Sequence, residues 1–220
     1  MSVCGTPRCG SGHPRPGRYH RRNPVSNSGE DTLRLFQSTG AYLRGHFRLT
    51  SGLHSPEYLQ CALVLSHPDH AESLGRNLAW EIRRMDPSKV ELVVAPAMGG
   101  LIIGHEVARA LNARFLFTER GPDGKMTLRR GFEVKRGETA VVIEDVITTG
   151  GSLLEVIDQL KAAGVNVKGA GSIIDRSGGR VNLGVPRAAL ATLHVISYSE
   201  AECPLCKKGL PVQKPGSRAV

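Results

Sequence analysis

The stretch Val141-Val-Ile-Glu-Asp-Val-Ile-Thr-Thr-Gly-Gly-Ser152 decides the fold of this 220-residue chain. An apolar run leads into two adjacent acids, and small hydroxyl and glycine residues follow them. The run at 139–143 predicts a strand buried on both faces, and residues 152–163 predict a helix that ends at Gly164. The point where such a strand leads through polar residues into a helix is where open α/β sheets bind their ligands.

The segments on either side of this stretch alternate in the same way. Apolar runs at 92–95, 114–117 and 169–174 predict further buried strands. Apolar residues three or four positions apart predict helices at 69–85 and 101–111. Such alternation of strand and helix predicts an α/β fold with a Rossmann-like parallel sheet flanked by helices.

The residues before this α/β region predict a smaller unit. A short helix begins near Glu30 and ends at Gly40. Alternation of apolar and polar residues around Phe47 predicts a strand that runs into a turn at 51–52, and a second strand is predicted at 57–65.

Basic residues outnumber acidic ones by 29 to 20, but the excess lies at the two ends of the chain. Residues 1–28 carry five arginines and no acid, and residues 207–220 carry four basic residues and no acid. Residues 29–206 hold the remaining 20 basic and all 20 acidic residues, and are formally neutral. We therefore predict a disordered basic tail at 1–28, one folded domain at 29–206, a basic C-terminal tail at 207–220, and no nucleic-acid partner.

The composition suits a chain with a hydrophobic core. Hydrophobic residues make up 40% and charged residues 22% of the sequence, which excludes a wholly disordered or collagen-like protein. No apolar run reaches the roughly 18 residues that cross a bilayer, and the N-terminus lacks the apolar stretch of a secretory signal. We expect a cytoplasmic protein with no membrane partner.

Two groups of cysteines have spacings that could serve a metal. Cys4 and Cys9, together with His13, lie in the Gly-, Pro- and Arg-rich tail, where disorder is favoured over a weak metal site. The pair Cys203-Pro-Leu-Cys206 has the spacing of a zinc knuckle, but no second pair follows nearby in the sequence. Two reduced thiols are the favoured interpretation, and the alternatives are a disulfide or zinc, for which a dimer could supply two such pairs.

The central stretch has the chemistry of a sugar-phosphate site. Small residues at 148–152 let backbone N–H groups surround a phosphate at the positive end of a helix. Glu144 and Asp145 would repel a phosphate, so their suitable partners are ribose hydroxyls or a hard cation. The stretch matches neither a Walker A loop nor a dinucleotide fingerprint. The alternative is an ordinary βα turn with a chance pair of acids.

Glu144-Asp-Val-Ile-Thr-Thr-Gly-Gly-Ser152 resembles the phosphoribosyl diphosphate (PRPP) signature of the type I phosphoribosyltransferases. Three other stretches are similar to the orotate-specific members of that family. They are Gly45-His-Phe-Arg-Leu-Thr-Ser-Gly-Leu-His-Ser55 with Tyr58, Ala95-Pro-Ala-Met-Gly-Gly100, and Asp175-Arg176. The resemblance implies the type I fold, with a small hood at about 30–66 and a core at about 69–200. It also implies transfer of ribose 5-phosphate from PRPP to orotate, releasing pyrophosphate, in pyrimidine nucleotide synthesis.

The resemblance also implies roles for particular residues. The residues implied in PRPP binding are Arg120, Glu144, Asp145, Val146, Ile147, Thr148, Thr149, Gly150, Gly151 and Ser152. Thr148 and Arg176 would contact orotate, and Asp145, Arg120 and Lys125 would be catalytic. Mg²⁺ would bind mainly through PRPP, without firm protein ligands, and the protein would be a homodimer with shared active sites.

The sequence departs from the better-known bacterial enzymes in three places. Thr50 and Gly99 stand where those enzymes carry lysines, and the segment 119–131 contains no histidine. This segment is rich in glycine and charge and predicts a loop with few apolar anchors, whose cations would be Arg120, Lys125, Arg129 and Arg130.

Two other functions are compatible with the same signature. A purine-type phosphoribosyltransferase would combine it with a different hood. A non-catalytic PRPP-sensing regulator would need a basic folded surface or an added DNA-binding domain, and the neutral segment 29–206 favours neither.

Overall fold

The computed structural model describes residues 29–49, 51–86 and 88–215. The predicted N-terminal tail, with Cys4, Cys9 and His13, lies outside the described residues, as do Thr50 and residues 216–220.

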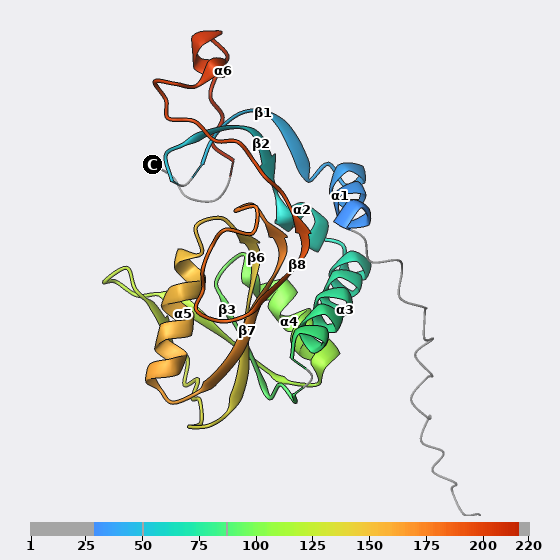
Figure 1. Ribbon diagram of the computed structural model, residues 1–220, viewed down its shortest axis with the longest axis vertical. Helices are drawn as coiled ribbons and strands as arrows, with labels where there is room; N and C mark the ends of the chain where they lie inside the picture. Colours follow the sequence, from blue (N-terminus) through green and yellow to red (C-terminus); the bar gives the residue numbers. More distant parts are fainter. Residues whose placement is uncertain (1–28, 50, 87, 216–220) are drawn as a thin grey trace, which may run out of the picture.

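A six-stranded sheet forms the centre of the molecule (Figure 1). Five of its strands are parallel, in the order β4 (Arg114–Arg120), β3 (Leu92–Pro96), β6 (Thr139–Ile147), β7 (Asn166–Asp175) and β8 (Arg187–Thr192). The short strand β5 (Met126–Leu128) pairs antiparallel with β4 at one edge. The predicted α/β class is confirmed, and each predicted core strand is present with longer ends.

Helices cover both faces of this sheet. Helices α3 (Pro68–Met85) and α4 (Gly100–Leu111) lie on one face, and α5 (Gly151–Ala162) lies on the other (Figure 1). Strand side chains alternate between the faces, so Val93 and Val141 join the core under α3 and α4 while Val94 and Val142 join the core under α5. This two-sided burial explains the continuous apolar runs in the sequence.

A smaller unit lies above the carboxyl edge of the sheet, and we call it the hood (Figure 1). Its centre is an antiparallel pair of strands, β1 (Tyr42–Arg48) and β2 (His54–Leu59). Helix α1 (Gly29–Ser38) precedes the pair, and α2 (Cys61–Leu65) connects it to α3. Backbone hydrogen bonds tie residues 198 and 213 to these strands, so the end of the chain, including α6 (Pro204–Lys207), completes the hood.

The predicted strand at 57–65 is wrong in its second half, because residues 61–65 form helix α2. A five-residue apolar run fits a buried strand and a buried helix equally well. Here Cys61, Val64 and Leu65 are the buried positions, which is the spacing of one helix face.

Residues 207–215 also differ from the sequence prediction of a basic tail. The backbone N–H of Gln213 donates to His46 O at 2.8 Å, and Gln213 O accepts a hydrogen bond from Arg48 N at 2.8 Å. The absence of acids near the end of the chain predicted a tail, but backbone pairing is independent of side-chain charge.

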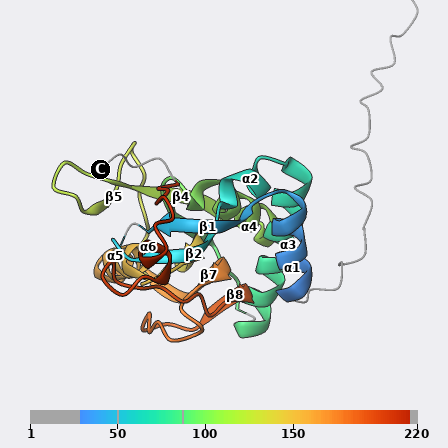
Figure 2. The same cartoon turned by 90° about the horizontal axis from the view of Figure 1, so that it is seen from above.

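The segment 119–131 forms a hairpin rather than an irregular loop. Strand β4 continues to Arg120, which pairs with Met126 at the start of β5. Met126 is buried against α5, so the hairpin has an apolar anchor, whereas the sequence predicted a loop with few such anchors. The turn of this hairpin projects away from the rest of the chain (Figure 2).

Candidate functional site at the carboxyl edge of the sheet

The two acids of the signature lie within β6, near its carboxyl end. Successive side chains of a strand point to opposite faces, and the neighbours of the two carboxyls agree with this. The Asp145 carboxylate lies against the backbone of Gly99, where a Cβ atom would be only 2.6 Å from Oδ1. Glu144 lies instead within the electrostatic reach of Arg120. The side chains of Glu144 and Asp145 therefore lie on opposite faces of the sheet at its carboxyl edge.

Burial disfavours the charged form of both acids. It raises the pKa of Glu144 to about 8, with a smaller contribution from the neighbouring charge of Asp145, and the positive charge of Arg120 opposes the shift. Burial also raises the pKa of Asp145, although the backbone N–H of Val146 donates to its Oδ1 at 2.9 Å and opposes that shift. Groups that offer hydrogen-bond donors or positive charge would stabilise the ionised forms.

The residues after β6 form an open loop at the start of α5. Thr148 and Thr149 are exposed, and Gly150 has a left-handed backbone conformation with φ of 76°. A Cβ at Gly150 would lie 2.6 Å from Val181 Cγ1, so only glycine fits this turn. Backbone N–H groups in the first turn of a helix lack partners within the helix, which makes this loop suited to an anion.

Arg176 follows directly after β7, and its backbone N–H donates to Ile147 O at 2.8 Å. Its Nε atom is buried and has no hydrogen-bond partner among the described residues. Burial lowers the pKa of Arg176, and the charges of Tyr58 and Glu57 on β2 oppose that shift. Arg176 thus lies between the sheet edge and the hood as a partly buried cation with an unused donor.

Asp175 organises the turn that follows Arg176. Its carboxylate is almost fully buried and accepts hydrogen bonds from the backbone N–H and the hydroxyl of Ser177, at 2.7 and 2.6 Å. Arg187 approaches its other oxygen at 3.4 Å. Asp175 is therefore occupied within the turn, whereas Arg176 is left available.

The cations of the hairpin 119–131 differ in their availability. Arg120 forms an ion pair with Glu155 of α5 at 3.2 Å, and Arg130 pairs with Glu119 at 2.7 Å. Lys125 lies exposed in the turn and forms no ion pair with the described residues. In this conformation Lys125 is free to meet a ligand, whereas Arg120 would have to leave Glu155.

Two hood residues next to the acid pair, Tyr58 and Cys61, had no role predicted from the sequence. Burial and the charge of Asp145 raise the pKa of Tyr58, and the same two causes hold the pKa of Cys61 well above its ordinary value. Both side chains are therefore close to Asp145 at the carboxyl edge of the sheet. Tyr58 alone had a signal in the sequence, through the hood resemblance, and Cys61 was hidden in an apolar run.

A groove formed by the described residues lies elsewhere. A groove of about 550 Å³ runs between the hood strands and the C-terminal segment, and no residue of the signature loop lines it. The acid pair, the signature loop and Arg176 thus lie at the sheet edge and not in this groove.

None of the described helices combines the length and the apolar character of a membrane-spanning helix.

The fold and the loop after β6 define a protein of the phosphoribosyltransferase class, and the profile of the family described as "Phosphoribosyl transferase domain" matches residues 64–183. The chain is 53% identical over 191 residues to the orotate phosphoribosyltransferase of Pelotomaculum thermopropionicum, covering 87% of this chain and 98% of that relative. The chain belongs to the orotate phosphoribosyltransferase family.

Solved structures agree with this assignment. The crystal structure of orotate phosphoribosyltransferase from Aeropyrum pernix superposes with a TM-score of 0.60 and 26% identity, covering 73% of this chain and 92% of that chain. Adenine phosphoribosyltransferase from Saccharomyces cerevisiae superposes with a TM-score of 0.56 at 15% identity, covering 72% and 99%, and this likeness concerns the fold alone.

Proposed function

We propose that this chain transfers the 5-phosphoribosyl group of PRPP to orotate, giving orotidine 5′-phosphate and pyrophosphate for pyrimidine nucleotide synthesis. The observation that carries this proposal is Arg176, whose buried Nε lacks a partner beside the signature loop. Orotate is a pyrimidine with a carboxylate, and a guanidinium can bind such a group with two parallel hydrogen bonds. A purine base has no carboxylate to offer this arginine.

The acid pair is suited to stabilise a positively charged transition state. As the bond from ribose to pyrophosphate breaks, positive charge grows on the ribosyl ring. Asp145 and Glu144, whose pKa values burial raises, gain hydroxyl donors from the ribose and then a nearby cation. Interactions that strengthen as the charge develops lower the barrier, because they favour the transition state over the bound substrate.

The remaining signature residues would hold the 5-phosphate. The loop 148–152 leads into the start of α5, where the helix dipole favours a negative group. Thr148 and Ser152 add hydroxyl donors, and the exposed Thr148 would also contact the base. We assign Val146 and Ile147 a backbone role, since their positions within β6 fix where this loop begins.

Mg²⁺ is part of the proposal as a companion of PRPP. Among the described residues, no three carboxylates converge into a metal cage, and the acid pair offers only two groups pointing to opposite faces. These residues fit a cation that arrives on the diphosphate and that one of the two acids supports. When bound, Mg²⁺ would neutralise charge on the leaving pyrophosphate.

We further propose a homodimer in which the hairpin 119–131 reaches the site of the neighbouring subunit. Its turn projects from the chain (Figure 2) and carries the exposed Lys125. The ion pair of Arg120 with Glu155 is more than a third exposed on both sides, so it is a weak contact that a pyrophosphate could replace. Arg120 and Lys125 would then stabilise the leaving group.

The deciding experiment follows the consumption of orotate in the presence of PRPP and Mg²⁺, with product identified by mass spectrometry. Adenine, hypoxanthine and uracil serve as competing bases in parallel reactions. We expect rapid transfer to orotate alone. Preferential transfer to a purine would support the purine-type alternative, and PRPP binding without transfer to any base would support a regulator.

A further inference from the structure

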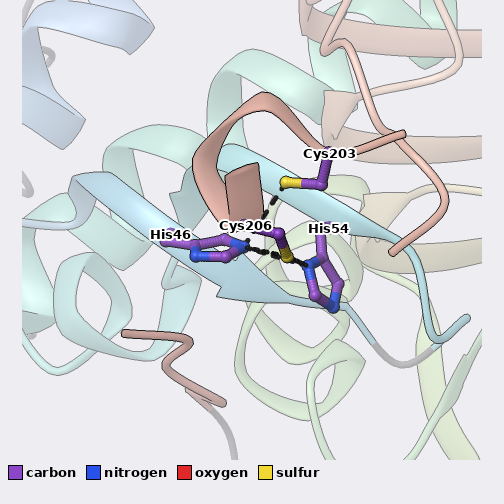
Figure 3. A group of neighbouring side chains, drawn as sticks. All are labelled: His46, His54, Cys203 and Cys206. Carbon is purple, nitrogen blue, oxygen red and sulfur yellow. Dashed lines mark hydrogen bonds between the residues drawn. The ribbon is translucent and has the colours of Figure 1, made fainter. Parts of the chain in front are cut away.

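Four side chains that commonly bind metals converge in the hood, far from the signature loop in sequence (Figure 3). His46 comes from β1, His54 from β2, and Cys203 and Cys206 from the C-terminal segment around α6. One ligand atom of each residue lies within 4.8 Å of the corresponding atoms of the other three. Three separate segments of the chain thus meet at one point.

The distances between these atoms are close to the edges of a tetrahedral zinc site, and two of them are shorter. Zinc binds nitrogen at about 2.0–2.1 Å and sulfur at about 2.3 Å, which places tetrahedral ligands about 3.3–3.8 Å apart. His46 Nε2 lies 3.4 Å from Cys203 Sγ and 3.6 Å from Cys206 Sγ. His54 Nδ1 lies 3.2 Å from Cys206 Sγ and 2.9 Å from His46 Nε2. Small outward shifts would admit an ion at the centre.

Hydrogen bonds alone do not account for this arrangement. His46 Nδ1 lies 2.9 Å from Leu210 O, and because a carbonyl only accepts, this nitrogen carries the proton. The Nε2 atom of a neutral His46 then has one lone pair, yet His54 and both cysteine sulfurs crowd around it. One lone pair satisfies one donor, whereas a cation would use a lone pair from each of the four groups.

We propose that His46, His54, Cys203 and Cys206 bind one structural Zn²⁺ ion. The pair Cys203 and Cys206 has the spacing of a zinc knuckle, and both are free thiols in the structure. His46, His54 and Cys203 are 3%, 2% and 0% exposed, so the four ligands would leave no open position for water or substrate. The Leu210 carbonyl holds the His46 ring in the orientation that presents Nε2.

The zinc would hold the C-terminal segment against the hood. The hood has only two strands, and an isolated pair of strands is marginally stable. Strand β2 carries His54 at its start and Tyr58 near its end, where Tyr58 faces Asp145 and Arg176. A metal that fixes β2 would therefore position the hood above the site where the base is expected.

The test begins with the metal content of the purified wild-type protein, measured by mass spectrometry of the elements. We expect one zinc per chain. X-ray absorption at the zinc edge should show two sulfur neighbours at about 2.3 Å and two nitrogen neighbours at about 2.0 Å. The double variant Cys203→Ser/Cys206→Ser should lose the zinc, and the matched double variant Cys4→Ser/Cys9→Ser should keep it.

Several results would overturn the proposal. One is wild-type protein that lacks zinc and takes up neither Zn²⁺ nor Co²⁺ after reduction. Another is zinc retained by the Cys203→Ser/Cys206→Ser protein, which would place the metal elsewhere. If that variant is insoluble, absorption by Co²⁺-substituted wild-type protein decides, since intense thiolate-to-cobalt bands require cysteine ligands and their absence contradicts the site. In a supporting outcome, zinc removal by a chelator lowers the melting temperature and zinc alone restores it.

Discussion

At the scale of single residues, the site combines a partly buried cation, Arg176, with two partly buried acids, Glu144 and Asp145. Arg176 lies close enough to Tyr58 and Cys61 for their charges to interact, and Asp145 acts on the same two groups. A buried donor without a partner is costly. The site therefore offers groups whose hydrogen bonds a substrate would complete.

Arg176→Lys tests the assignment of the base. The lysine keeps the positive charge but loses the planar fork, so we expect orotate affinity to fall about ten- to a hundredfold, the equivalent of one charge-assisted hydrogen bond. PRPP affinity should change little, and calorimetry with each substrate measures both. Arg180→Lys is the control, because the Nε of Arg180 already donates to Ser177 O. Equal losses for both substrates would contradict a role specific to the base.

Glu144→Gln tests the burial of the acid pair through stability. The pKa of Glu144 is raised from 4.5 to about 8, so the folded state binds more protons than the unfolded state between these values. The free energy of unfolding of the wild type should then fall as pH rises through that window. In the Gln variant this contribution is absent, and urea unfolding at several pH values should give a flatter profile.

The surface variant Glu133→Gln changes the net charge equally and should keep the wild-type profile. The same pH dependence in wild type and Glu144→Gln would show that Glu144 titrates normally.

At the scale of elements, the turn between β6 and α5 determines the geometry of the proposed phosphate cradle. This turn is held from below by the segment after β7, since Val181 and Leu183 pack beneath Gly150. The signature is therefore a local motif with a long-range support. Two glycines of the signature differ in their surroundings. Gly150 has a left-handed backbone conformation and is crowded, whereas Gly151 has space around it.

A matched pair of alanine substitutions tests this difference between the two glycines. Gly150→Ala combines a left-handed alanine with overlap against Val181, so we expect a loss of about 2–4 kcal/mol in the free energy of unfolding. Gly151→Ala meets nothing closer than Thr149 Oγ1 at 3.7 Å, and its stability should stay near that of the wild type. Thermal and denaturant unfolding compare the two. A stable Gly150→Ala protein would mean that the turn can adopt another conformation.

At the scale of the whole molecule, the chain consists of a sheet that carries the signature loop and a hood above the carboxyl edge of that sheet (Figure 1). The two ends of the described chain both lie near the hood, because α1 precedes β1 and residues 198 and 213 pair with the hood strands. Loss of the C-terminal segment would therefore expose β1 and β2. The hairpin 119–131 leaves the molecule at another point and is available to a second copy (Figure 2).

Mixing two inactive proteins tests the shared-site dimer. Asp145→Asn should lower activity about 10²–10³-fold, because it keeps the shape of the side chain and removes the charge that opposes the growing cation. Arg120→Ala should be impaired through the leaving group. If Arg120 acts across the interface, random exchange of subunits restores about a quarter of the wild-type sites. If Arg120 serves its own subunit, every site carries a defect, and no recovery after proven exchange would reject the arrangement.

The sequence by itself determined the α/β class, the strand–loop–helix of the signature and the helix ends at Gly40 and Gly164. These features depend on neighbours within a few residues, namely apolar periodicity, backbone conformation and caps, so their signals are contiguous in the chain. The apolar run at 61–65 shows the limit of this reasoning, since its period suits two structures and only packing against α3 decides between them.

Only the tertiary structure decided which distant groups meet. The sequence shows that residue 176 is an arginine, but only the folded structure shows that its buried Nε lacks a hydrogen-bond partner among the described residues. His54 lies 152 residues before Cys206 and His46 lies 157 residues before Cys203, and no local pattern connects the two pairs. They meet because the C-terminal backbone pairs with the hood strands, and the pairing of strands far apart in sequence is set by the global fold.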